Sequence, residues 1–147
     1  MSLKEQLLKD MQAAMKSRDN LRKTTISMAR AAILQVEKDK QVQLDDEGVI
    51  EVLAKEIKSR KDAIPEFERG NRPDLVQKLE AEIAILSEYM PEQLSKDEIN
   101  CMIDEAIAEV GAKSAKDMGA VMKALMPRVK GRADGAVVNQ MVRAKLQ

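Results

Sequence analysis

The chain has 147 residues, 34% charged and 44% hydrophobic, a globular composition long enough for one compact domain or two small ones. It has no histidine and one cysteine, which excludes a Ser-His-Asp or Cys-His triad, a His-containing zinc site and an internal disulfide. Lysine plus arginine equals aspartate plus glutamate at 25 each, so the net charge favours no class of partner.

Apolar residues recur with helical spacing over residues 1–93 and predict about four helices. Ser2, Asp19 and Asp45 are placed to cap the first three helices, and Pro73 suits the first turn of the fourth. The connections between the helices are short, which predicts antiparallel helical hairpins. No strand pattern is present, so the predicted fold class is all-α.

Three sequence features carry expectations about the interior of these helices. Pro65 predicts a kink or break near Ile64, and Pro127 interrupts a later helical pattern in the same way. Gly70 fits the residue that follows the end of the third helix. Methionines at helical spacing are expected to pack in the core in place of the missing aromatic residues. These methionines are Met11, Met15, Met28, Met118, Met122 and Met126.

Residues 94–147 predict a second, smaller domain of three helices. Pro91 ends the preceding helix, and Ser95 with Glu98 forms a capping box for the next one. Ser114 and Asp134 are placed to cap the two helices that follow. The predicted domains are therefore residues 1–93 and 94–147.

Residues 55–62 carry charges of both signs at helical spacing. Glu56 with Arg60, and Lys58 with Asp62, are i,i+4 pairs, which favours a solvated helix face over a binding site. No acidic cluster has the spacing of a magnesium or calcium site, and no phosphate-binding glycine motif is present. The sequence predicts no catalytic residue, no cofactor and no metal.

Charge is distributed unevenly along the second domain. Residues 95–112 contain five acids and one lysine, whereas residues 113–147 contain eight bases and two acids. Bases gather around a glycine turn that leads to a helix start, where backbone N–H groups can bind an anion. The candidate anion-binding residues are Lys123, Arg128, Lys130, Gly131 and Arg132, and the family resemblance described next makes a nucleic acid the expected anion. The alternative is that Gly131 ends one helix, Asp134 caps the next and the cations are solvated.

Several motifs in the same order resemble the GatB/YqeY family, and stand-alone YqeY proteins in particular. They are RKD at 60–62, NRxDLV at 71–76, YMPEQLS at 89–95, MGxVM at 118–122 and VKGRADG at 129–135. The resemblance implies a helical N-terminal domain joined to a domain similar to the tail of the B subunit of aspartyl/glutamyl-tRNA amidotransferase. In that enzyme the tail helps to hold tRNA, and the transamidation chemistry lies elsewhere.

Three functions follow from these observations. The first is a tRNA-associated accessory protein that contacts RNA through its C-terminal domain and lacks the catalytic domains of the amidotransferase. The second is a helical adaptor that binds a protein partner through its N-terminal helices. The third is an independent carbon–nitrogen ligase with glutamine as amido donor. The absence of a targeting signal and of a membrane-spanning segment predicts a cytoplasmic protein without a membrane role.

Overall fold

The computed structural model describes all residues, 1–147, and is built from helices without strands. The helices are α1 (Leu3–Ser17), α2 (Asn20–Lys40), α3 (Asp46–Arg69), α4 (Pro73–Ser87), α5 (Lys96–Val110), α6 (Met118–Val129) and α7 (Gly135–Leu146), with a 3-10 turn, η1 (Ala115–Asp117). The all-α prediction is confirmed. None of the helices is both long enough and apolar enough to cross a bilayer.

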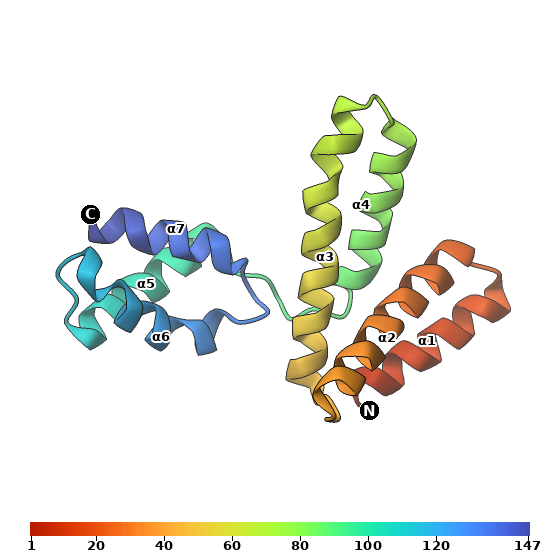
Figure 1. The fold of residues 1–147 in the computed structure, drawn as a ribbon, viewed down its shortest axis with the longest axis horizontal. Helices are drawn as coiled ribbons and strands as arrows, with labels where there is room; N and C mark the ends of the chain where they lie inside the picture. Colours follow the sequence, from red (N-terminus) through yellow and green to blue (C-terminus); the bar gives the residue numbers. More distant parts are fainter. The chain divides into compact units, whose positions relative to one another are not determined.

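The chain divides into two compact units, Met1–Met90 and Pro91–Gln147, which we call unit 1 and unit 2. Unit 1 contains the hairpins α1–α2 and α3–α4, and unit 2 contains α5, α6 and α7 (Figure 1). Each unit has its own hydrophobic core. Whether residues 1–93 and 94–147 fold as independent domains, as predicted, is tested by the Leu125→Ala experiment in the Discussion.

Unit 1 is held together by a core that all four of its helices supply. Leu7 of α1, Ile26 of α2, Leu53 of α3 and Leu86 of α4 are fully buried in one cluster. Unit 2 has a separate cluster in which Ile103, Leu125, Val138 and their neighbours are buried. Burial of apolar surface contributes about 25 cal/mol per Å², so these two clusters are the main source of stability in each unit.

Side-chain caps at the helix starts agree with the sequence pattern. The side chains of Ser2, Asp19, Asp45, Ser95 and Asp134 each accept a hydrogen bond from a backbone N–H in the first turn of the following helix. Ser95 and Glu98 form the complete capping box. Such caps satisfy donors that a helix start leaves without an intrahelical partner.

Neither internal proline breaks its helix, so of the predicted kink or break the break is absent. Pro65 lies inside a continuous α3, and Pro127 lies inside a continuous α6. Both prolines are exposed, so the carbonyl group that loses its helical donor can be hydrated, and the helix tolerates the lost bond. The end of α3 also differs from expectation. Gly70 has φ −79°, and Asn71, with φ 54°, takes the left-handed conformation instead.

Three of the methionines predicted to lie in the core are exposed. The exposed fractions are 54% for Met15, 51% for Met28 and 37% for Met126. In α2 the buried face runs through Ile26, Ala29 and Ile33, which turns Met28 toward solvent. Interior packing therefore does not explain these methionines.

Candidate functional site

The turn between α6 and α7 holds three of the five residues predicted to bind nucleic acid. Gly131 has φ 76°, a conformation that glycine adopts without strain. The backbone N–H groups of Arg132 and Ala133 both donate to the carbonyl oxygen of Val129, at 2.9 and 3.1 Å. The hypothesis that the N–H groups directly after Gly131 are open to an anion is therefore wrong for these two groups.

The same turn anchors the segment that enters unit 2. The backbone N–H of Leu94 donates to the carbonyl of Arg132 at 2.8 Å, and Gln93 Nε2 donates to the carbonyl of Gly131 at 2.9 Å. In return, Arg132 Nε donates to the carbonyl of Glu92 at 3.3 Å. Gly131 and Arg132 thus hold the segment that precedes α5 in place through these hydrogen bonds.

Ion pairs connect the acidic helix α5 to the two basic helices. Arg128 Nη2 lies 2.7 Å from Glu105, and Lys145 Nζ lies 2.5 Å from Asp104. Both pairs are largely exposed, so each adds little stability, but each reduces the charge that its cation presents to an anion. Unit 2 as a whole is close to neutral, with nine bases and eight acids in residues 91–147.

The remaining predicted cations are Lys123, which lies on α6, and Lys130, which directly follows the last residue of α6. They are seven residues apart, and both are exposed. Arg128 lies roughly 140° around the helix from Lys123, because successive residues turn by about 100°. We call the exposed side the α6 outer face. It consists of Gly119, Ala120, Lys123, Met126, Pro127 and Lys130.

The structure therefore separates the predicted cluster into three groups. Lys123 and Lys130 share the α6 outer face, Arg128 pairs with Glu105, and Gly131 with Arg132 holds the entering chain. Sequence reasoning missed the parts played by Glu105 and Gln93. Both contact residues more than twenty positions away, so no local pattern could have revealed them.

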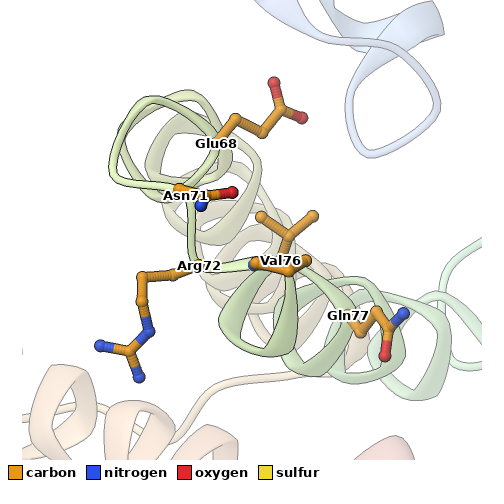
Figure 2. A pocket seen from close by; sticks show the side chains of 6 residues that line it. Glu68, Asn71, Arg72, Val76 and Gln77 are labelled. Carbon is orange, nitrogen blue, oxygen red and sulfur yellow. The ribbon is translucent and has the colours of Figure 1, made fainter.

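Two hollows on unit 1 have polar side chains in their walls. One, of about 340 Å³, lies at the α3–α4 tip and is lined by Glu68, Asn71, Arg72, Pro73, Val76 and Gln77. Figure 2 shows the Arg72 side chain turned away from Val76 and Gln77. Arg72 hydrogen-bonds Asp74 at 3.1 Å and thereby lowers the pKa of that carboxyl group. Because both side chains of this ion pair are exposed to solvent, the pair does not indicate a catalytic or binding group in the hollow.

The second hollow, of about 460 Å³, lies beside the end of α4. There Tyr89 donates to Asp10 at 2.5 Å, and Arg22 donates to Glu88 at 2.6 Å. Burial and the neighbouring Asp10 raise the pKa of the Tyr89 hydroxyl far above its ordinary value, so the phenol keeps its proton and its bond to Asp10 even in alkaline solution. These bonds fasten the residues after α4 to α1 and α2. No group of three or more potential ligands is close enough to hold a metal ion.

Comparison with known proteins places this fold in a family. The YqeY-like protein family matches residues 4–146. The chain therefore belongs to the YqeY-like family, which is the stand-alone part of the resemblance drawn from the sequence motifs.

The chain is also similar to several fungal proteins. A Lachancea thermotolerans protein named "Altered inheritance of mitochondria protein 41, mitochondrial" is 37% identical over 107 residues, which cover 71% of this chain and 57% of the relative. A protein of the same name from Kluyveromyces lactis has the same identity over 71% of this chain and 58% of its own length. The Pyrenophora tritici-repentis protein of that name is 32% identical over 142 residues, which cover 94% of this chain and 75% of the relative. The chain thus spans a little over half of the first two relatives.

The predicted cytoplasmic location is contradicted by these relatives, whose names describe them as mitochondrial. The prediction took the cytoplasm as the default because the chain shows no targeting signal. Such an absence carries no physical information about the compartment, so the assignment had no positive support.

Proposed function

We propose that this YqeY-like protein is an RNA-associated accessory protein and that unit 2 contacts the backbone of a structured RNA. The observation that carries the proposal is the α6 outer face, which brings exposed Lys123 of α6 together with exposed Lys130 at the end of the helix. One turn before Lys123, Gly119 has no side chain and Ala120 has only a methyl group, so a bulky polyanion can approach the helix closely. The resemblance to the amidotransferase B-subunit tail supplies tRNA as the class of RNA.

The chemistry of unit 2 favours contact with phosphates over contact with bases. The two aromatic residues of the chain, Phe67 and Tyr89, both precede unit 2, so unit 2 has no ring on which a base could stack. Lysines bind phosphate oxygens as point charges and carry no sequence information. The protein should therefore recognise the shape and backbone of the RNA more than its sequence.

A salt series tests this proposal. Each phosphate contact contributes a slope of roughly 0.7–0.9 to the fall of log K with log salt, through release of condensed counterions. Replacing Lys123 and Lys130 together with alanine should lower the slope for tRNA binding by about one to two units. The measurement is tRNA affinity of the full chain at several salt concentrations, with helicity checked first by circular dichroism.

Matched variants in unit 1 provide the control. Lys55 and Lys58 are also exposed helical lysines, and replacing both with alanine should leave the slope nearly unchanged. Equal losses from the two pairs would indicate diffuse attraction instead of a site. The proposal also fails if the wild-type protein shows no binding to tRNA near physiological salt.

A further inference from the structure

A second surface, on unit 1, combines apolar side chains with cations and has no role in the proposed RNA contact. We call it the α1–α2 face. It consists of Lys4, Leu8, Met11 and Met15 of α1 with Arg30 and Leu34 of α2. The four α1 residues follow one another at spacings of four, three and four, which places them on one stripe of the helix.

Contacts between the helices show that the two stripes adjoin. Met11 Sδ accepts hydrogen bonds from Ser27 Oγ at 3.2 Å and from Arg30 Nη1 at 3.7 Å. Near the other end, Lys4 Nζ lies 2.6 Å from the carboxylate of Glu37. Between these contacts lies a small hollow of about 50 Å³, which is lined by Lys4, Leu7, Arg30, Ile33 and Leu34. The face is therefore a shallow groove along a helix pair.

Several large apolar side chains on this face are exposed to solvent and are not part of the core of unit 1. The exposed fraction is 58% for Leu34, 54% for Met15 and 37% for Leu8. Contiguous exposed apolar surface with polar neighbours marks interaction sites on soluble proteins. Methionine and leucine adapt well to a partner's side chains, and methionine is common on binding surfaces for that reason.

The charges on the face indicate what the partner carries. The charge of Lys4 is met by Glu37, whose pKa the lysine lowers. Arg30 is half-buried beside the groove, and its one hydrogen bond is to a thioether sulfur, which is a weak acceptor. A guanidinium group in this position is best matched by a carboxylate, which it can bind with two parallel hydrogen bonds.

We propose that the α1–α2 face docks an acidic amphipathic helix of a partner protein. Its apolar side chains would cover Leu8, Met15 and Leu34, and a carboxylate would meet Arg30. A helix laid along the groove of a helical pair buries its apolar stripe in the way a third helix completes a bundle. Glu37 pairs with Lys4, so Arg30 is the one cation of the face without a carboxylate partner. A single cation attracts an anionic bilayer only weakly, which favours a protein partner.

Selection of helical peptides on the full chain tests the inference. The probe is a phage-displayed library of amphipathic peptides of about four turns, in which the polar positions vary freely. We expect the selected peptides to carry Leu, Ile or Met on one stripe with Asp or Glu beside it. Arg30→Glu should weaken their binding about tenfold or more, and exchanging the peptide's acids for lysine should restore affinity for this variant.

Variants of the same helix pair separate docking from loss of folding. Lys9→Glu reverses an exposed charge on α1 that lies about 100° around the helix from Leu8, outside the α1–α2 face, and should leave peptide binding nearly unchanged. Leu34→Lys alters a side chain that is already 58% exposed, so it should abolish binding while preserving helicity. Selection of basic peptides, or equal losses from Arg30→Glu and Lys9→Glu, would overturn the inference.

Two further outcomes would assign the face to another occupant and so also overturn the inference. In the first, the protein binds vesicles of phosphatidylcholine and phosphatidylglycerol, Arg30→Glu abolishes this binding, and the library yields no specific peptides. The second is a concentration-dependent dimer in sedimentation velocity that Leu34→Lys dissociates, which would make a second copy of the chain the occupant. None of these results bears on tRNA binding by unit 2.

Discussion

Replacing Arg60 with methionine is expected to destabilise unit 1 by about 3–5 kcal/mol, the usual cost of removing one partner from a buried ion pair. Arg60 is 7% exposed and joins two carboxylates inside the α3–α4 hairpin. Its Nε donates to Glu82 at 3.0 Å, and its Nη1 donates to Glu56 at 2.9 Å. Without the guanidinium group, the buried Glu82 loses its counter-charge and its donor together.

Urea unfolding of three variants measures this effect. Glu82→Leu should cost less than Arg60→Met, because Arg60 keeps its bond to Glu56 in that variant. The double variant Arg60→Met with Glu82→Leu should recover much of the loss, since apolar residues of similar size can replace a buried ion pair. A loss below about 1 kcal/mol for Arg60→Met would show that water reaches the pair and screens it.

The second large effect is expected from Leu125→Ala in unit 2. Leu125 is fully buried in the separate core of this unit, and such a truncation costs about 2–5 kcal/mol. A unit of this size has only marginal stability, so the loss is comparable with its whole free energy of unfolding. Unit 2 should therefore unfold at a much lower temperature while unit 1 keeps its transition.

Limited proteolysis and thermal unfolding together measure the independence of the units. In the Leu125→Ala variant, brief proteolysis should remove the C-terminal part and leave a folded fragment that ends between Met90 and Lys96. Met126→Ala, at the neighbouring exposed position, is the control and should have little effect. A single transition in which both units lose stability equally would contradict the predicted division into two domains.

Local patterns explain why the helix boundaries could be predicted from the sequence. A cap such as Asp19 or Ser95 acts on N–H groups two or three residues away, so its effect is contained in a short stretch of sequence. Helical periodicity likewise located the buried stripes that contain Leu53 and Ile103. The continuity of α3 through Pro65 could not be predicted from such local patterns, because the cost of a proline depends on whether solvent reaches the carbonyl that it leaves without a donor.

Contacts between distant residues could not be predicted in this way. The pair of Glu56 with Arg60 was predicted and is present, but as part of a buried network and not on a solvated face. The difference is Glu82, which comes from another helix. In the same way, Arg128 pairs with Glu105 of another helix, and Arg132 donates to the chain that enters unit 2. Periodicity identifies which side of a helix is buried, but it does not identify the charged residues of other helices that contact that side.

Acetylation footprinting of lysines in the full chain, with and without tRNA, tests the proposed RNA contact most directly. The proposal predicts that tRNA protects Lys123 and Lys130 from acetylation, because their ammonium groups then contact phosphates. Lys38 and Lys55, which are exposed on unit 1, should react at the same rate in both samples. Protection of the unit 1 lysines, or unchanged reactivity of Lys123 and Lys130 under conditions where tRNA is bound, would contradict a binding site on the α6 outer face.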